Sequence, residues 1–309
     1  MSLSKEYRRS EGKYLVYRND LKYRSERGLD KRRIIWDDLN VKYLFENVDT
    51  DSLGYRLHEC RKSGMRHLDL NNLDLVVFPE IPEEFLGAVR CLFVAENDLE
   101  ELPDMTDFKK LEMLEIGNNN INNLGRLPAS LIEFACRSNR IKFLPDPEEC
   151  PNLIRVDCSM NEIVRIPYYR KLKSLKCSNN KLGEIPELES LENLVCNNND
   201  IVKIDERCVN LKYLDCSNNR LNHIEIYPNL VDLICSGNSS IGELGVYPNV
   251  KYIEIFMTKI RVIPFMKCLE EIFCERDMIQ KISEKYVAVC DISVKIHKGK
   301  MLQITFRKK

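Results

Sequence analysis

Apolar and polar positions alternate along this chain in a unit that returns about every nineteen residues. Between residues 171 and 204 the unit appears twice, as "KLKSLKCSNNKLGEIPELES" and then "LENLVCNNNDIVKI". Apolar residues stand at the first, fourth and sixth positions, asparagine at the ninth, and aliphatic residues at the eleventh and fourteenth. The alternation over the first six positions predicts a short strand with one buried face.

Eleven such units follow one another between residues 65 and 282. The segments between strands show no helical pattern and contain prolines, so they are predicted to be extended or turn-like. Stacked units would bring each residue against its own counterpart, about 4.8 Å away in a parallel sheet. The units begin at Met65, Val89, Leu111, Leu131, Leu153, Leu172, Leu191, Leu211, Leu230, Val250 and Leu269.

This repeat resembles that of the leucine-rich repeat family, over about 70% of the chain. Its cysteine-bearing form, "LKCSNN", is similar to repeats of bacterial and large-virus members of the family. The resemblance implies an α/β-type solenoid, a horseshoe with a parallel β-sheet on its concave side and a mostly non-helical convex side. It also implies a short helical cap before the first repeat.

Two columns of the repeat carry residues that could serve chemistry or architecture. The asparagines follow the strand, where backbone groups lose their ladder partners, and a side-chain amide can satisfy backbone groups of neighbouring coils. The cysteines of the sixth position point sideways in parallel and do not converge, so no metal site and no disulfide is expected. We interpret both columns as architecture. The cysteines are Cys136, Cys158, Cys177, Cys196, Cys216, Cys235 and Cys274.

The ends of the chain fall outside the repeat pattern. A helix is expected to begin at Asp51 or Ser52 and to end at Gly64, capping the first repeat. After the repeats, alternation at Val287 and Val289, and again near Ile304, predicts strands that close the stack. The expected divisions are a basic N-terminal arm at 1–50, the helical cap at 51–64, the repeats at 65–282 and a C-terminal cap at 283–309.

The N-terminal region admits a second interpretation. Residues 1–33 hold eleven Lys/Arg against five Asp/Glu, although the whole chain has a net charge of -1. Residues 31–63 also bear a faint resemblance to an F-box, the helical motif that docks onto ubiquitin-ligase scaffolds and often precedes such repeats. Here the usual leading Leu-Pro pair is absent, and the chain reads Ile35-Trp36-Asp37.

Motifs for catalysis and cofactor binding are missing from the sequence. There is no phosphate-binding G-x-x-x-x-G-K-[ST], no G-x-G-x-x-G and no H-E-x-x-H, and the four histidines are scattered. We therefore expect no enzyme, no catalytic residues, no metal and no cofactor. No apolar stretch has the length of a transmembrane helix or of a signal peptide, which favours an intracellular, cytoplasmic location. Neither nucleic acid nor a membrane is expected as a partner.

The third, fifth and seventh repeat positions should point out of the concave face. Acidic residues outnumber Lys and Arg nine to three there, which favours a basic protein partner. Exposed aromatic and aliphatic residues gather in the C-terminal half, and such residues commonly anchor protein interfaces. The candidate partner-binding residues are Tyr213, Asp215, Ile234, Tyr252, Glu254, Phe256 and Phe273.

Three functions fit these patterns. The first is a non-enzymatic protein–protein interaction scaffold that binds its partner on the concave face, with the chain as a monomer. The second is an F-box-like adaptor that selects substrates for a ubiquitin ligase. The third is a structural component of a larger assembly, with the basic arm making the contact.

Overall fold

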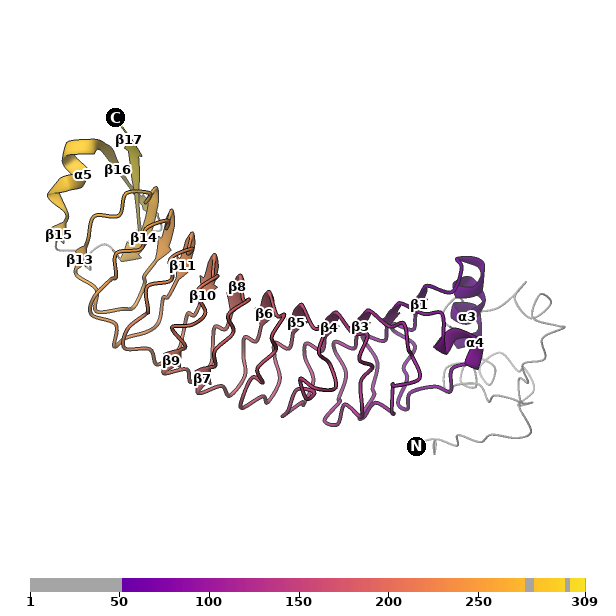
Figure 1. Cartoon of the computed structure of the whole chain (residues 1–309). Coiled ribbons are helices and arrows are strands. Elements are labelled where there is room, and N and C mark those ends of the chain that lie inside the picture. Colours follow the sequence, from indigo (N-terminus) through magenta and orange to yellow (C-terminus); the bar gives the residue numbers. More distant parts are fainter. Residues whose placement is uncertain (1–51, 276–280, 298–300, 309) are drawn as a thin grey trace. The chain divides into compact units, whose positions relative to one another are not determined.

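The computed structural model describes residues 52–275, 281–297 and 301–308, which fall into two compact units that divide between Arg140 and Ile141. The expected basic arm, and the F-box-like segment up to residue 51, lie outside the described residues. The chain is a parallel-sheet solenoid, as its repeats predict: each coil is a short strand, a turn and a return segment (Figure 1). None of the helices in the described part has the length and hydrophobicity that crossing a membrane requires.

The first unit begins with helix α3 (Leu53–Lys62), which confirms the expected N-terminal helix. Ser52 caps it, because its hydroxyl oxygen accepts a hydrogen bond from the backbone N of Tyr55 at 3.2 Å. Gly64 follows the helix at φ +87°, a conformation that favours glycine. The apolar face of the helix is buried through Leu53, Leu57 and Cys60.

Four repeat strands of the first unit pair in parallel and in register. Their first residues, at the third repeat position, align side by side, and the central residue of each strand is buried. The strands are β1 (His67–Asp69), β2 (Cys91–Phe93), β3 (Met113–Glu115) and β4 (Glu133–Ala135), and a short helix, α4 (Glu83–Leu86), precedes β2.

The second unit carries seven more repeat strands. Each begins at the third repeat position, so the fourth and sixth positions face the core and the third and fifth face solvent. The strand positions expected from the sequence are therefore confirmed. The strands are β5 (Arg155–Asp157), β6 (Ser174–Lys176), β8 (Asn193–Val195), β10 (Tyr213–Asp215), β11 (Asp232–Ile234), β12 (Tyr252–Glu254) and β14 (Glu271–Glu275).

The side of the coils opposite the sheet of repeat strands is mostly extended chain, as expected. Two pairs of two-residue strands lie there in the second unit, and each pair is parallel. They join β7 (Glu184–Ile185) to β9 (Lys203–Ile204) and β13 (Val262–Ile263) to β15 (Lys281–Ile282).

The asparagine column bonds backbone groups of neighbouring coils, as the sequence predicts. The amide nitrogen of Asn199 donates to the carbonyl oxygens of Cys177 and Cys196, both at 3.0 Å, and its oxygen accepts from the backbone N of Leu182 at 3.0 Å. Asn180 makes the same set of bonds one coil earlier. Each asparagine thus ties its own turn to the coil before it.

The residue before the ninth repeat position, where the ladder asparagines stand, has positive φ in ten of the units, a feature that the sequence analysis missed. Asn179, Asn198 and Asn218 lie there at φ +52° to +56°, and Gly237 lies there at +77°. Asparagine and glycine enter this left-handed region at least cost, which explains the doubled asparagine of "CSNN".

The seven column cysteines are buried and free, in keeping with an architectural role. Burial raises the pKa of Cys177, Cys196 and Cys216 well above the ordinary thiol value, and that of Cys235 to about 12. These side chains therefore behave as small neutral hydrophobes.

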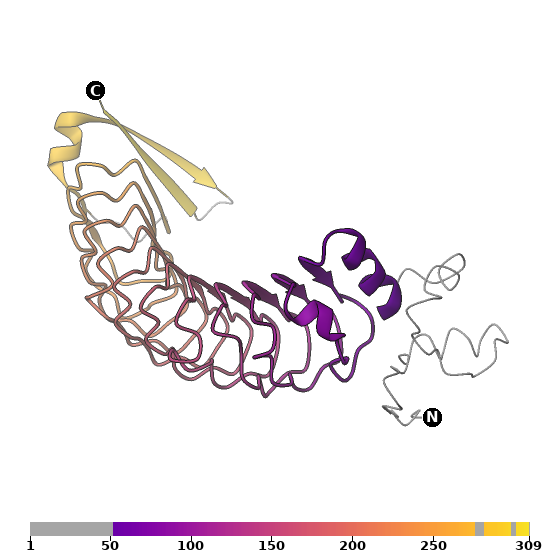
Figure 2. The ribbon, with the colours of Figure 1, turned by 45° about the vertical axis from the view of Figure 1, so that its right-hand side comes forward.

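The C-terminal end departs from the repeat in helix α5 (Glu284–Val289) and strands β16 (Cys290–His297) and β17 (Met301–Lys308). β17 pairs antiparallel with β14, and β16 pairs antiparallel with β17; Figure 2 shows them as two long yellow arrows. Strands were expected at Val287 and Val289 as well, and that prediction is wrong, because both lie in α5.

Helix α5 forms because it carries Tyr286 into the core. The Tyr286 ring lies 4.3 Å from that of Phe306 and 4.9 Å from that of Phe265, measured between centroids. Its hydroxyl accepts a hydrogen bond from the backbone N of Met266 at 2.8 Å. These tertiary contacts outweigh the strand preference of the valines beside it.

Candidate functional site

Solvent-facing side chains of β10, β11, β12 and β14 form a patch in which rings and carboxylates alternate. All eight are half-buried, and we call them the aromatic–acid patch. Each ring lies level with a carboxylate on the next strand, within reach of a cross-strand contact. The third repeat position gives the row Tyr213, Asp232, Tyr252, Glu271, and the fifth gives Asp215, Ile234, Glu254, Phe273.

Two aromatic rings of the patch are in contact. Tyr252 and Phe273 lie on adjacent strands, two positions apart, with ring centroids 5.4 Å apart and planes inclined by 38°. This offset arrangement is one that aromatic pairs prefer, and it holds both rings in place. The two rings therefore form a rigid apolar surface open to solvent on one side.

Two carboxylates of the patch are oriented by serines. Asp215 accepts hydrogen bonds from the backbone N and the hydroxyl of Ser217, at 3.1 and 2.7 Å. Glu254 accepts one from the hydroxyl of Ser236 at 3.0 Å, and that hydroxyl in turn accepts from the backbone N of Phe256. The negative groups are thus positioned before any partner arrives.

The patch has a negative electrostatic environment. Burial, then Asp215, Asp232 and Glu254, raise the pKa of Tyr213. Burial and the adjoining Glu254 raise the pKa of Tyr252 to about 12. Burial also raises the pKa of Asp232, and only Lys251 opposes the shift. The carboxylates among these groups would stabilise a cation placed between them.

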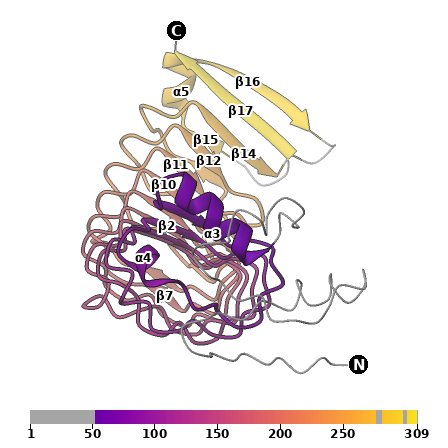
Figure 3. The same cartoon turned by 90° about the vertical axis from the view of Figure 1, so that its right-hand side faces the viewer.

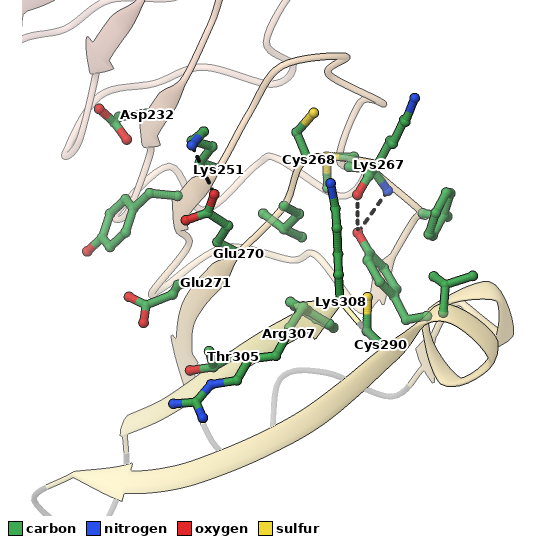
Figure 4. A pocket seen from close by; sticks show the side chains of 17 residues that line it. Asp232, Lys251, Lys267, Cys268, Glu270, Glu271, Cys290, Thr305, Arg307 and Lys308 are labelled. Carbon is green, nitrogen blue, oxygen red and sulfur yellow. Dashed lines mark hydrogen bonds and ion pairs between the residues drawn. The ribbon is translucent and has the colours of Figure 1, made fainter.

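A pocket of about 1240 Å³ overlaps the C-terminal side of the patch and shares Asp232, Tyr252 and Glu271 with it. Figure 4 shows its repeat-side acids, Asp232, Glu270 and Glu271, and two cations on β17, Arg307 and Lys308. One acid is already neutralised, because Lys251 Nζ lies 2.9 Å from a carboxylate oxygen of Glu270. The shared acids of the patch therefore lie next to cations on this side, whereas the eight patch residues themselves carry negative charge alone.

The described residues contain no group of three or more His, Cys, Asp or Glu side chains that could hold a metal ion. The arrangement of the patch is suited to contact with another molecule, because a rigid ring pair and oriented carboxylates lie on one solvent-facing sheet.

The structure brings six of the seven predicted site residues together in the patch. Phe256 is the exception; it follows β12 at the seventh repeat position and is also half-buried. The sequence-based selection missed Asp232 and Glu271, although both stand in the third repeat position between the aromatic residues. It also missed Gln303 of β17, whose side-chain amide donates to Glu271 at 3.1 Å, because β17 carries no repeat signal.

Neither a family model nor a curated protein matches the sequence significantly. Solved structures do match. The leucine-rich repeat protein LIC12759 of Leptospira interrogans is 23% identical, covers 71% of each chain and has a TM-score of 0.56. YopM, a leucine-rich effector protein of Yersinia pestis, is 22% identical over 75% of this chain and 83% of its own, also with a TM-score of 0.56.

The functional domain of InlJ from Listeria monocytogenes, which includes a cysteine ladder, is similar too. It is 22% identical over 70% of this chain, with a TM-score of 0.51, and the match spans about half (52%) of that chain. At these sequence identities the comparisons support the fold alone. The chain therefore has the leucine-rich repeat fold, in the cysteine-bearing form that its sequence resembles.

Proposed function

We propose that this chain is a non-enzymatic scaffold that binds a protein partner through the aromatic–acid patch and the neighbouring Phe256. The observation that carries the proposal is the ring pair of Tyr252 and Phe273, held 5.4 Å apart on a solvent-facing sheet and set among carboxylates. Aromatic rings in such surroundings supply much of the binding energy of protein interfaces, since they bury a large area at a small entropy cost.

The partner should present Lys or Arg side chains to the patch. None of the eight patch residues is basic, and four are acidic. An arginine laid over the Tyr252 ring would gain a cation–π contact and could pair with Glu254 or Glu271 beside it. The same acids would repel nucleic acid and anionic membrane surfaces, which supports a protein partner.

A binding role without catalysis fits the state of the reactive groups. The column cysteines are buried and neutral, so they offer no thiolate nucleophile. The patch carboxylates Asp215 and Glu254 are engaged with serine hydroxyls at their own strand ends. The thirteen free cysteines also support action in a reducing, intracellular compartment.

The F-box-like adaptor and the assembly component remain predictions. The adaptor depends on residues 31–63, of which 31–51 lie outside the described residues, and the assembly component depends on the basic arm at 1–50, which lies outside them altogether. No contact in the described part favours either over simple partner binding. We therefore rest the proposal on the patch alone.

The test uses the double variant Tyr252→Ala/Phe256→Ala. Wild type and variant, immobilised as full chains, are exposed to the same lysate, and the retained proteins are compared by quantitative mass spectrometry. We expect a specific, basic binding partner to be retained by the wild type and lost by the variant, because the aromatic anchor is gone.

A matched control removes the same two residue types elsewhere in the second unit. Phe143 and Tyr168 are exposed and lie outside the repeat strands. The variant Phe143→Ala/Tyr168→Ala should retain the partner as the wild type does. If the patch variant and the wild type retain the same proteins with the same affinity, the patch is not the binding site.

A further inference from the structure

Strand β16 forms the free edge of the C-terminal sheet. β17 lies between β14 and β16, and no described strand pairs with the outer side of β16 (Figure 3). At eight residues, β16 is longer than any of the repeat strands. An exposed edge of this length offers a row of backbone donors and acceptors to another strand.

The pairing pattern identifies which backbone groups face outward. The backbone N of Phe306 donates to the carbonyl oxygen of Glu270, so the even-numbered residues of β17 bond toward β14 and the odd-numbered ones toward β16. Because Ser293 is paired with Thr305, the odd-numbered residues of β16 bond to β17. The N–H and C=O groups of Ile292, Val294 and Ile296 therefore point to the free edge.

The same three residues form an apolar stripe on one face of β16. Val294 and Ile296 are each 54% exposed, and Ile292 is half-buried. Within the chain, Ile292 pairs with Phe306 and Val294 with Ile304, and both of these β17 residues are buried. The stripe therefore lies on the same face of the sheet as they do, but it is more exposed than they are. Native proteins usually protect an edge with inward charge, proline or a short strand, and this stripe has none of these.

The opposite face of β16 carries one acid and one base, placed symmetrically about Ser293. Asp291 stands two residues before it and Lys295 two residues after it, and both are exposed. If two copies of β16 pair antiparallel about Ser293, each Asp291 lies opposite the Lys295 of the other copy. Centring the pairing on residue 291 or 295 instead would set like charges against each other, which is destabilising.

We propose that β16 is a homodimerisation edge, through which two copies of this chain pair antiparallel about Ser293. In this register Ile292 lies opposite Val294 of the second copy, and both have outward-facing backbone groups, so the ladder hydrogen bonds can form. The apolar stripes of the two copies then run together on one face, and two Asp291–Lys295 pairs form on the other. The contact is isologous, as in most homodimers.

The proposal departs from the monomer expected from the sequence, and it does not depend on the partner-binding function. One pair of eight-residue strands gives an interface at the small end of the usual range. We therefore expect a weak dimer, with a dissociation constant of roughly 1–100 µM. Sedimentation velocity of the full chain across that concentration range should show conversion from monomer to dimer.

Charge reversal tests the register. Lys295→Asp places Asp opposite Asp in the dimer and should weaken self-association about tenfold or more, since two attractive pairs become two repulsive ones. Asp291→Lys should do the same, although its new lysine also faces Arg307 of its own chain. An equimolar mixture of the two variants should form a heterodimer, because every pair across the contact is then opposite in charge.

A second variant tests the edge without changing charge. Val294→Pro removes an N–H that faces outward, so pairing with β17 should survive and dimerisation should be lost. The control is Val287→Ser, because Val287 is an exposed residue of α5 and lies outside the β16 edge. Circular dichroism checks that each variant is folded. A wild type that stays monomeric to 100 µM, or a dimer that none of the three β16 variants weakens, overturns the proposal.

Discussion

Gly237 and Asn218 occupy the same left-handed position in consecutive coils, and Gly237 leaves room for the Asn218 side chain. A β-carbon on residue 237 would overlap Asn218 Oδ1 and lie 3.0 Å from its backbone N. The φ of Gly237 is +77°, which an alanine adopts only at a cost. The packing of the coil that holds Asn218 thus depends on the small size of residue 237 in the next coil.

We expect Gly237→Ala to lower the free energy of unfolding by about 1–3 kcal/mol, from the left-handed backbone and the crowding of Asn218 together. Urea denaturation measures the change. Gly242→Ala is the control, because a β-carbon there meets nothing within 4 Å and its φ is ordinary; it should change stability by less than about 0.5 kcal/mol. Equal losses in the two variants would contradict the steric argument.

Asn219 provides a test of the asparagine ladder. Its amide nitrogen donates to the carbonyl oxygens of Cys196 and Cys216, at 3.0 and 2.9 Å, and its oxygen accepts from the backbone N of Ile201 at 3.0 Å. The side chain is buried, so Asn219→Ala leaves the buried N–H of Ile201 without its acceptor and takes one of two asparagine donors from each carbonyl, since Asn199 also donates to Cys196 and Asn238 to Cys216. We expect a loss of about 2–5 kcal/mol in urea denaturation.

Two further variants separate the ladder from ordinary asparagine bonding. Asn219→Asp keeps the acceptor for Ile201 but removes every donation of the side-chain amide to backbone carbonyls, so it should also be strongly destabilised at neutral pH. Asn210→Ala removes a single exposed bond, to the carbonyl oxygen of Glu189, and should cost less than about 1 kcal/mol. If Asn219→Ala costs no more than Asn210→Ala, the column is not what ties the coils together.

The repeat allowed the position of each repeat strand to be predicted from the sequence. In every unit but the last, the third and fifth positions are the solvent-facing ends of the strand, at Tyr213 and Asp215 as at Tyr252 and Glu254; β14 of the last unit continues to Glu275. Eleven copies of one pattern reinforce each other, and register follows once each residue stacks on its counterpart. The same logic identified the hydrogen-bonding role of the ladder asparagines.

Features without a repeated pattern were not predictable in this way. At Val287 the local preference for strand gave way to the tertiary contacts of Tyr286, which no sequence window contains. The positive φ of Met257 is imposed by its position in the coil and has no signal in its residue type. The contact of Tyr252 with Phe273 could be predicted only once the register of their strands was known. The free edge of β16 could be predicted only once the order of the last strands was known.

Thiol accessibility offers a third prediction. Of the thirteen cysteines, only Cys91 and Cys268 are not buried, and burial together with Glu112 and Glu133 raises the pKa of Cys91. In the native protein at pH 8, iodoacetamide should modify Cys268 first, Cys91 more slowly and the column cysteines last, because alkylation requires an accessible thiolate.

Mass spectrometry of peptides, with and without urea, measures the order. In urea all thirteen thiols should react at similar rates, which serves as the control for reagent and digestion. Rapid native labelling of Cys196 or Cys216 would show that the coils open far more readily than their burial indicates.

Because the pKa of Asp232 is raised, removing its charge should raise the stability of the fold but weaken the binding of a basic partner. Burial disfavours its charged form, so the folded state holds the proton more tightly than the unfolded chain does. The carboxyl group therefore contributes stability that is fully present below its unfolded pKa and is lost as pH rises through the folded pKa. Asp232→Asn, which cannot ionise, should be more stable than wild type at pH 7.

The stability gain of Asp232→Asn should shrink as pH falls through the folded pKa of the wild-type group, because both side chains are then neutral. Thermal unfolding between pH 7 and pH 3 measures this. Glu243→Gln is the control for replacing a carboxylate by an amide, because Glu243 is exposed and lies outside the patch. Binding of a basic partner should weaken in Asp232→Asn, because the patch loses a negative charge. In the wild type that charge is present at the expense of stability. A variant that is both less stable at pH 7 and unchanged in binding would show that Asp232 serves the packing of β11 and not the recognition of a cation.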